Sequence, residues 1–167
     1  MSDDQSPTHG AWVGPSSIGT LFAQRARIEG DRVALIEGDR TRSFAELNQR
    51  VNRLAHVLLN CGVTHGDRVA LLARNCIEYV EVELACGKIG AITACQNWRL
   101  ADAELQHCLT LVEPSLIIVA PDYLETLERL NLPDLTVIAI GVDYETRLAS
   151  SPTTEPEIEV DDSEDFD

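Results

Sequence analysis

Apolar residues recur with the period of an amphipathic helix between residues 43 and 62. Six of them fall on one helical stripe: Leu47, Val51, Leu54, Ala55, Leu58 and Leu59. Ser43 and Glu46 have the spacing of a capping box, in which each side chain accepts a hydrogen bond from a backbone N–H at the helix start. Gly62 supplies the left-handed conformation that commonly ends a helix. The pattern predicts a helix between Ser43 and Gly62.

Short, continuous apolar runs follow this helix and are typical of buried strands. The runs cover residues 69–73, 91–95, 116–120 and 135–140, and helical segments are expected at 76–89, about 102–112 and about 122–131. Asn75 precedes Glu78 by three residues, so we expect it to cap the first of these helices. Such strands, separated by helices, are typical of a parallel sheet that is covered on both faces. The sequence predicts an α/β fold with a mostly parallel sheet flanked by helices.

The N-terminal part of the chain adds a short helix and a β-hairpin to this fold. The stretch from Ile18 to Ile28 has roughly helical spacing, and Gly38-Asp39 lies between two strand-like runs, which is a strong hairpin signal. We expect residues 1–16 to be a disordered leader and residues 17–150 to form the α/β unit. Residues 151–167 are expected to be a flexible acidic tail or linker.

His65-Gly66-Asp67 lies between the predicted helix end and the first predicted strand, where the chain must turn. Gly66 gives backbone freedom, and Asp67 can accept hydrogen bonds from neighbouring amides. Adjacent residues in a tight turn rarely aim both side chains at one point, and no nucleophile accompanies them. We interpret the motif as a turn and not as a catalytic His–Asp pair.

The formal net charge is −15, and eight acidic residues with no basic one lie between Glu155 and Asp167. This run predicts a solvated tail or linker, with docking on a basic partner as the alternative. Overall acidity disfavours nucleic acid as a partner because phosphates would repel it. No apolar run is long enough to span a membrane, and no secretion signal is present.

Five cysteines, an odd number without a C-x-x-C pair, predict reduced thiols and a cytoplasmic protein. His107-Cys108 has no second ligand pair at a suitable spacing, so no metal site is predicted. Gly87 and Gly90 close a predicted helix, whereas a dinucleotide fingerprint needs glycines that open one. No phosphate-binding P-loop motif occurs in the sequence. The residues after the first parallel strand also lack the acidic cluster of a receiver-type domain.

Five soft motifs in order resemble the N-terminal part of acyl-CoA synthetases in the adenylate-forming (AMP-binding) superfamily. They are Ser43-Phe44-Ala45-Glu46-Leu47, the G-V-x-x-G-D-R-V-A-L run from Gly62 to Leu71, Asn75, Lys88 to Ala91, and the N-x-R-L motif from Asn97 to Leu100. The chain departs from the family at Cys95-Gln96, where members often carry a proline and an aliphatic residue. The resemblance covers nearly the whole chain and implies the N-terminal portion of the large domain of such an enzyme.

The resemblance implies a parent enzyme that uses ATP, Mg²⁺ and coenzyme A to convert a carboxylic or fatty acid into its acyl-CoA. The family's Ser/Thr/Gly-rich phosphate loop with its lysine does not occur in this sequence. We therefore expect a fragment that is itself inactive, with no bound cofactor, no catalytic residue and no metal ligand. The alternative is a stand-alone, non-catalytic interaction module that docks through its acidic tail.

Lys88 is the one candidate ligand-binding residue, because some family members place a basic residue there that meets the coenzyme A phosphates. A cation near a helix C-terminus is equally favoured by the helix dipole. Asn97 and Arg99 are expected to fix the strand-to-helix turn rather than to touch substrate, and the sequence leaves Trp98 open. An unpaired sheet edge is expected to permit a homodimer.

Overall fold

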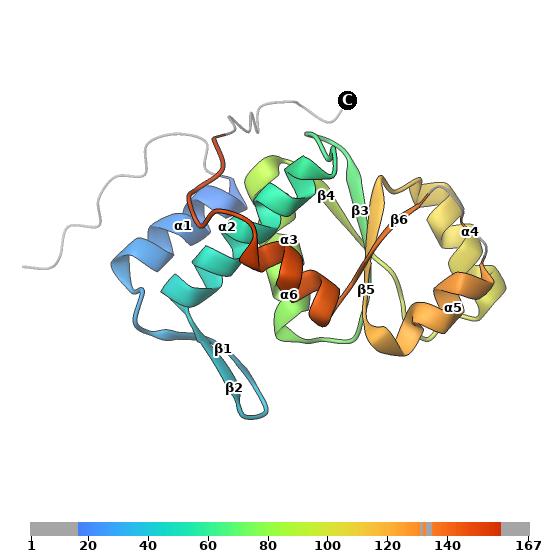
Figure 1. Ribbon diagram of the computed structural model, residues 1–167, viewed down its shortest axis with the longest axis horizontal. Helices are drawn as coiled ribbons and strands as arrows, with labels where there is room; N and C mark the ends of the chain where they lie inside the picture. Colours follow the sequence, from blue (N-terminus) through green and yellow to red (C-terminus); the bar gives the residue numbers. More distant parts are fainter. Residues whose placement is uncertain (1–16, 131, 133–134, 158–167) are drawn as a thin grey trace, which may run out of the picture.

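The fold is described from a computed structural model that places residues 17–130, 132 and 135–157 (Figure 1). The helices are α1 (Ile18–Ile28), α2 (Phe44–Asn60), α3 (Ile77–Ile89), α4 (Asp102–Val112), α5 (Leu124–Arg129) and α6 (Val142–Ala149), with a 3-10 turn, η1, at Pro121–Tyr123. The strands are β1 (Val33–Glu37), β2 (Arg40–Ser43), β3 (Arg68–Leu72), β4 (Ile92–Cys95), β5 (Leu116–Val119) and β6 (Thr136–Ala139).

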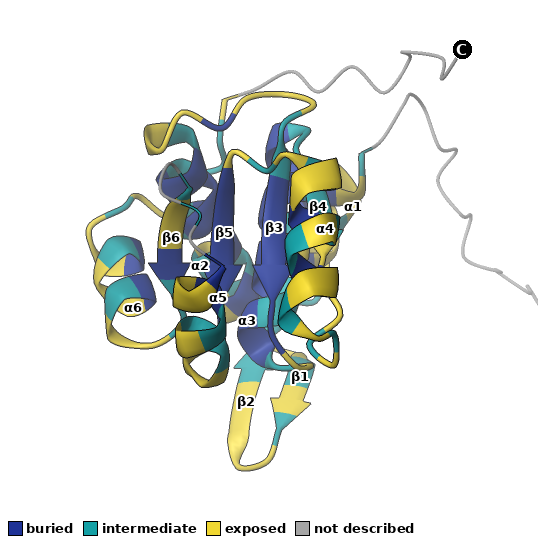
Figure 2. Cartoon of the chain, turned by 90° about the vertical axis from the view of Figure 1, so that its right-hand side faces the viewer, coloured by how far each residue is buried: buried dark blue, intermediate teal, exposed yellow. Residues whose placement is uncertain are grey.

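Four of the strands form one parallel sheet in the order β4-β3-β5-β6. The other two, β1 and β2, pair as an antiparallel hairpin that projects from the bottom of the molecule in Figures 1 and 2. This arrangement confirms the predicted α/β class, the N-terminal hairpin and the positions of all four buried strands. The predicted leader, residues 1–16, lies outside the described residues, as does most of the predicted acidic tail.

The two faces of the parallel sheet are covered by different helices (Figure 1). Val69 and Leu71 of β3 belong to a core shared with α2, α3 and α6, whereas Ala70 and Leu72 belong to a second core shared with α4 and α5. Figure 2 shows the two central strands, β3 and β5, as buried along almost their whole length between these layers. Alternating residues of one apolar strand thus serve two cores, which explains why the strands lack polar alternation.

Local signals place α2 as predicted. The Ser43 hydroxyl accepts the Glu46 N–H at 3.2 Å, and the Glu46 carboxylate accepts the Ser43 N–H at 2.9 Å. The helix ends at Asn60, and Gly62 follows with φ of 86°. Most of the predicted apolar stripe is buried against the sheet and α3. The capping box, the stripe and the terminating glycine are therefore all confirmed.

The predicted cap of α3 by Asn75 is wrong. The residue before the helix is Cys76, and its side chain makes no capping hydrogen bond. The Glu37 carboxylate at the end of β1 instead accepts the Ile77 N–H at 3.0 Å. An acceptor 40 residues earlier in the chain thus satisfies the helix start.

The turn between α2 and β3 is built by Asp67. Its carboxylate accepts hydrogen bonds from the Thr64 N–H at 2.7 Å and from the Thr64 hydroxyl at 2.8 Å. The hydrogen bond from the backbone N–H is the main cause that lowers the pKa of the Asp67 carboxyl group. Gly66 has φ of 77° and donates its N–H to the Gly90 carbonyl at 2.8 Å. His65 packs on Gly90, where a Cβ would lie 2.3 Å from the imidazole. These contacts confirm a structural turn.

Helix α1 crosses α3 at a close contact between two glycines and their neighbours. A Cβ on Gly19 would lie 2.8 Å from the Lys88 backbone, and a Cβ on Gly87 would lie 2.5 Å from the Ile18 side chain. A larger residue at position 19 would force the two helices apart, and one at position 87 would displace the Ile18 side chain. The crossing covers the C-terminal turn of α3 and contributes to the burial of Lys88.

Candidate functional site

The carboxyl ends of the parallel strands meet at one edge of the sheet, at the bottom of Figure 2. After β3 the chain enters α3 on one face of the sheet, and after β5 it enters α5 on the other face. The neighbouring strands β3 and β5 thus form a topological switch point, where open α/β sheets commonly bind ligands. This edge is the first place to search for a site.

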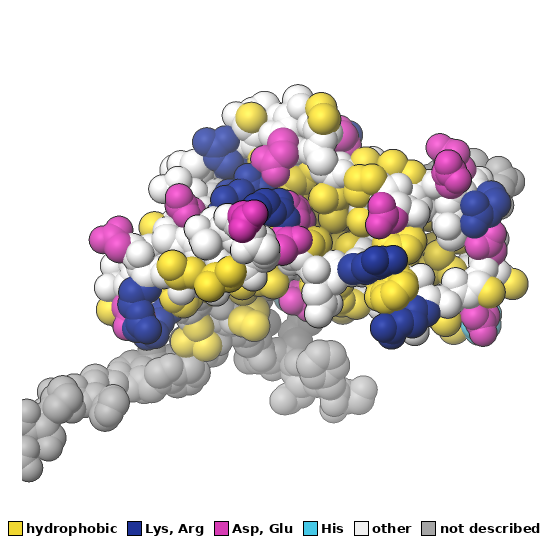
Figure 3. Space-filling view, turned by 90° about the horizontal axis from the view of Figure 1, so that it is seen from below, with side chains coloured by type: hydrophobic (Ala, Val, Ile, Leu, Met, Phe, Trp, Pro, Cys, Tyr) yellow, Lys and Arg dark blue, Asp and Glu magenta, His cyan; other side chains and the backbone are white. Residues whose placement is uncertain are grey.

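A cavity of ≈ 520 Å³ opens at this edge. Its walls come from the hairpin and from the loops after β3, β5 and β6: Glu37, Arg40, Arg74, Asn75, Cys76, Glu78, Ala120, Pro121, Asp122, Tyr123, Ile140, Gly141 and Glu145. Figure 3 looks onto this edge and shows hydrophobic side chains in the middle of the face, with charged side chains around them. We call this space the carboxyl-edge crevice.

An ion pair joins the hairpin to α3 on one side of the crevice. The Arg40 guanidinium donates to both oxygens of Glu78 at 2.7 and 3.1 Å and also contacts the Glu37 carboxylate. Burial raises the pKa of Glu78, but the hydrogen bond and charge of Arg40, together with a backbone hydrogen bond, outweigh that effect and lower the pKa below the usual value. The Arg40 cation is therefore already matched by two carboxylates, and this side of the crevice offers no free positive charge to an anionic ligand.

The Cys76 thiol on the same side is a poor nucleophile. Burial raises its pKa to about 11, and the neighbouring carboxylates act in the same direction. The thiol is therefore protonated near neutral pH, and only the thiolate attacks electrophiles efficiently. All five cysteines are free, in agreement with the expected reduced thiols.

Two arginines stack on one indole at the other side of the crevice. The guanidinium carbons of Arg74 and Arg99 lie 4.5 and 4.4 Å from the centroid of the Trp98 ring. Arg74 also donates its Nε–H to the Tyr123 hydroxyl at 3.0 Å, and the Tyr123 and Trp98 rings are 6.4 Å apart. We call Arg74, Trp98, Arg99 and Tyr123 the arginine–tryptophan cluster. It joins the ends of β3, β4 and β5.

Both arginines of the cluster are exposed, and among the described residues neither pairs with a carboxylate. Asn97 accepts the Arg99 N–H through its side-chain oxygen at 3.0 Å, so Asn97 fixes the turn as predicted. The Arg99 guanidinium takes no part in that turn. Its stacking leaves the N–H edge available to an anion.

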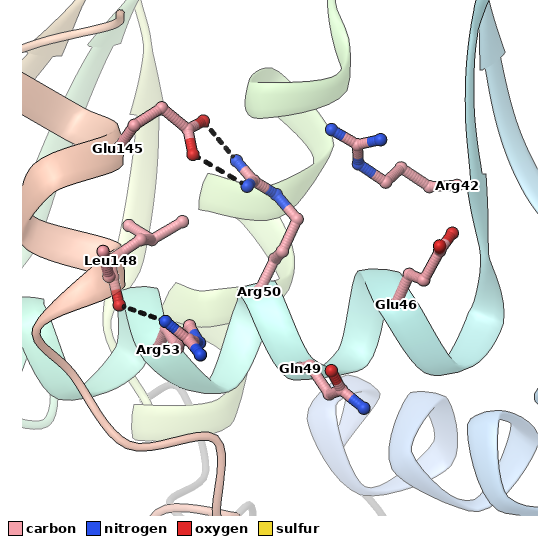
Figure 4. A pocket seen from close by; sticks show the side chains of 8 residues that line it. Arg42, Glu46, Gln49, Arg50, Arg53, Glu145 and Leu148 are labelled. Carbon is pink, nitrogen blue, oxygen red and sulfur yellow. Dashed lines mark hydrogen bonds and ion pairs between the residues drawn. The ribbon is translucent and has the colours of Figure 1, made fainter. Parts of the chain in front are cut away.

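Arg50 occupies a second hollow, of ≈ 290 Å³, between α2 and α6 (Figure 4). Its guanidinium binds Glu145 at 2.6 and 2.9 Å and the fully buried Glu81 at 2.5 and 3.1 Å. The Tyr144 hydroxyl donates to Glu81 at 2.8 Å, and its burial raises the pKa of the phenol. Arg42 points into the same hollow from β2. Because Arg50 is fully engaged, this hollow borders a structural ion network.

Lys88 lies in the last turn of α3 and is buried. Its ammonium group pairs with the Glu155 carboxylate. A coenzyme A phosphate would have to displace this carboxylate to reach the amine. The coenzyme A role of Lys88 stays a prediction.

Sequence reasoning did not single out Arg74, Tyr123 or the Arg40–Glu78 pair. Arg74 stands two residues beyond β3, and its position after a parallel strand was the available signal. No pattern in the sequence joins Arg74 to Trp98 or Tyr123, because the three residues come from different loops. The described residues contain no group of three or more side chains suited to holding a metal ion. None of the helices within the described ranges has the length and apolar character needed to cross a membrane.

Comparison with known proteins agrees with this fold. A feruloyl-CoA synthase of Amycolatopsis is 39% identical over 124 residues, which is 74% of this chain and 25% of that protein. A fatty acid–[acyl-carrier-protein] ligase, ScoC, of Streptomyces coeruleorubidus is 32% identical over 123 residues, or 73% of this chain and 24% of that protein. The chain thus spans about a quarter of the length of the curated relatives it matches.

Solved structures show the same architecture. The N-terminal domain of FACL13 from Mycobacterium tuberculosis superposes with a TM-score of 0.81 at 29% identity, covering 87% of this chain and 39% of that one. A Mycobacterium tuberculosis fatty acyl CoA synthetase gives 0.79 at 30% identity, covering 86% of this chain and 30% of that one. The sequence profile described as AMP-binding enzyme matches residues 22–165. The chain belongs to the family of AMP-binding enzymes and has the fold of the N-terminal region of acyl-CoA synthetases.

Proposed function

We propose that this chain is the N-terminal portion of an ATP-dependent acid–CoA ligase. The enzyme would join a carboxylic or fatty acid to coenzyme A and convert ATP to AMP and pyrophosphate. The names of the relatives support this reaction, since they include a feruloyl-CoA synthase and a medium/long-chain-fatty-acid–CoA ligase of Mycobacterium tuberculosis. Those two acids differ in kind, so the proposal names the reaction class and leaves the acid open.

The arginine–tryptophan cluster is the observation that carries a role for this chain. Coenzyme A and ATP are polyanions, and the surface of a chain with a net charge of −15 repels them. Arg74 and Arg99 place two positively charged guanidinium groups at the sheet edge where ligands bind in this class of fold. Guanidinium groups match phosphate oxygens in geometry and charge. We infer that this pair receives the phosphates of coenzyme A.

The chain's own residues would bind and orient substrate rather than form bonds. Stacking on Trp98 restricts both side chains before a phosphate arrives, which lowers the entropy lost on binding. Adenylation itself would require oriented donors around the α-phosphate together with Mg²⁺. Because the described residues hold no cluster suited to a metal, no step of that reaction is assigned to them.

A fluorescence titration tests the proposed coenzyme A contact. The chain has two tryptophans, so a Trp12→Phe background leaves Trp98 as the only indole reporter. We expect coenzyme A to quench Trp98 in the millimolar range and pantetheine, which lacks the nucleotide phosphates, to have no effect. Arg74→Ala and Arg99→Ala should each weaken binding about tenfold, because each removes charge-assisted hydrogen bonds.

The matched control is Arg32→Ala, which removes an exposed arginine that pairs with Glu29 near the hairpin. This variant should bind coenzyme A like the parent chain. Equal affinity of coenzyme A and pantetheine, or unchanged binding by both cluster variants, would show that the cluster does not receive phosphates.

The 167-residue chain alone is proposed to be inactive. Loss of one preorganised oxyanion donor typically costs ~10²–10³ in rate, and this sequence lacks the family's entire phosphate loop. We expect no pyrophosphate release from ATP with fatty or aromatic acids, measured by a coupled pyrophosphate assay. Formation of acyl-adenylate at a measurable rate would place an active site within these residues and contradict the proposal.

A further inference from the structure

Three polar residues on α2 form a ladder at positions i, i+4 and i+8, and each binds the segment that follows α6. The Asn48 amide donates to a Glu155 carboxylate oxygen at 2.7 Å, and the Asn52 amide donates to the Thr153 carbonyl at 2.8 Å. The His56 imidazole donates to the Thr154 carbonyl at 3.0 Å. One helix face therefore holds three consecutive residues, 153–155, of the segment that follows α6.

The carboxylate of Glu155 is held at both oxygens. Asn48 binds one oxygen, and the Lys88 ammonium binds the other. The Lys88 side chain is only 3% exposed, whereas the Glu155 side chain is 38% exposed. Gly19 of α1 packs directly on Lys88 and closes the far side of this small site. The site is thus built into α2 and α3, and its ligand arrives from a different part of the chain.

The buried ammonium group requires an anion. Burial lowers the pKa of Lys88, and the bond from Glu155 opposes that effect; the nearby Arg27 adds repulsion. No other acceptor of the Lys88 ammonium occurs within residues 17–130, 132 and 135–157. A buried charge without a partner is strongly unfavourable, so withdrawal of Glu155 would leave an uncompensated cation.

We propose that Lys88 and Asn48 form a carboxylate-binding site whose resident ligand is Glu155, and that this contact latches residues 153–157 onto α2 and α3. Glu157 carries the same charge two residues later but is exposed and makes no such contact. The site therefore selects the first carboxylate of the acidic run and fixes the point from which the rest of that run departs. The inference concerns the chain itself and does not depend on the proposed ligase activity.

Nuclear magnetic resonance relaxation of the 167-residue chain tests the latch. Glu155→Ala should lower the backbone order parameters of residues 153–157 from about 0.85 to below about 0.6, because the segment loses its anchor. Glu157→Ala removes the same charge from an exposed position and should leave them unchanged. Glu155→Gln keeps the size of the side chain but removes its charge, and it should also release the segment.

Acetate then tests the site as a carboxylate receptor. In Glu155→Ala, added sodium acetate should shift the side-chain amide signals of Asn48 saturably, and sodium chloride at equal ionic strength should not. The double variant Lys88→Met with Glu155→Ala should not respond to acetate. Unchanged order parameters in Glu155→Ala overturn the latch. An acetate response that is absent in Glu155→Ala, or that persists without Lys88, overturns the carboxylate site.

Discussion

Arg50 and the pair Arg74–Arg99 occupy opposite situations within one fold. Arg50 is largely buried between α2 and α6, and carboxylates of Glu81 and Glu145 satisfy its guanidinium group. Arg74 and Arg99 are exposed, and both stack on the Trp98 ring. All three are arginines in an acidic chain, yet only the last two keep their charge available.

The difference separates arginines that hold the fold together from arginines that can meet a ligand. A buried ion pair is costly to break because it leaves a charge without a partner. An exposed arginine that stacks on an aromatic ring contributes little to stability and keeps most of its hydrogen-bond donors free. Removal of the Arg50 side chain should therefore mainly lower stability, whereas removal of Arg74 or Arg99 should mainly weaken ligand binding.

The largest expected effect on stability follows the change Arg50→Ala. Glu81 is fully buried and would keep only the hydrogen bond from Tyr144, so the variant should lose about 3 kcal/mol of unfolding free energy. Urea unfolding followed by circular dichroism measures the loss. Arg147→Ala breaks an exposed pair with Asp143 on the neighbouring α6 and should cost less than about 1 kcal/mol. Equal losses in the two variants would remove the distinction between buried and exposed arginines.

Acidification should weaken the Arg50 network and leave the stacked pair unaffected. The bond from Arg50 lowers the pKa of Glu145 below 4.5, and Arg40 does the same for Glu78. A depressed folded-state pKa gives stability that is complete above the unfolded value and is lost as the pH falls through the folded value. The unfolding free energy should therefore fall below about pH 4.5.

Variants sharpen this pH prediction. The fall should be shallower in Arg50→Ala, because Glu145 no longer has the partner that lowers its pKa. Arg74→Ala should retain the slope of the parent chain, since its guanidinium is paired with no carboxylate among the described residues. Urea unfolding repeated between pH 3 and 7 gives both slopes. A slope altered by Arg74→Ala would indicate an acidic partner for that residue.

The smallest expected effect on stability belongs to the stacked arginines. Arg74→Ala and Arg99→Ala should each cost about 0.5–1 kcal/mol, the usual range for an exposed cation–π contact. The same urea experiment measures this change. A loss of unfolding free energy as large as that of Arg50→Ala would show that the arginine–tryptophan cluster stabilises the fold. Its proposed role in binding phosphates would then lose its physical basis.

Sequence patterns predicted the elements whose signals are local. The apolar stripe, the Ser43–Glu46 box and Gly62 all lie within twenty residues, and together they placed α2 correctly. The start of α3 was predicted to within one residue, but its cap was predicted wrongly, because Glu37 from the hairpin supplies the acceptor. Helix α6 was not predicted, since only Tyr144 and Leu148 of its eight residues are buried and no stripe emerges.

The candidate site was predictable only in part for the same reason. Asn97 and Arg99 stand out in the sequence through a short motif, and the hydrogen bond within that motif is local. The stacking of Arg74 on Trp98 joins loops that follow different strands, and no periodicity encodes it. Lys88 was noticed as a cation at a helix end, but its partner Glu155 lies 67 residues away.

The hairpin's contact with α3 has a consequence for the order in which the protein folds during synthesis. Helix α2 carries its own cap and can begin to form as soon as its residues leave the ribosome. Helix α3 has no cap of its own and gains that hydrogen bond only when the hairpin is in place. Because Glu37 precedes Ile77 in the chain, the acceptor is made before the donor that needs it. Synthesis from the N-terminus thus makes the residue that accepts this hydrogen bond available before α3 itself is complete.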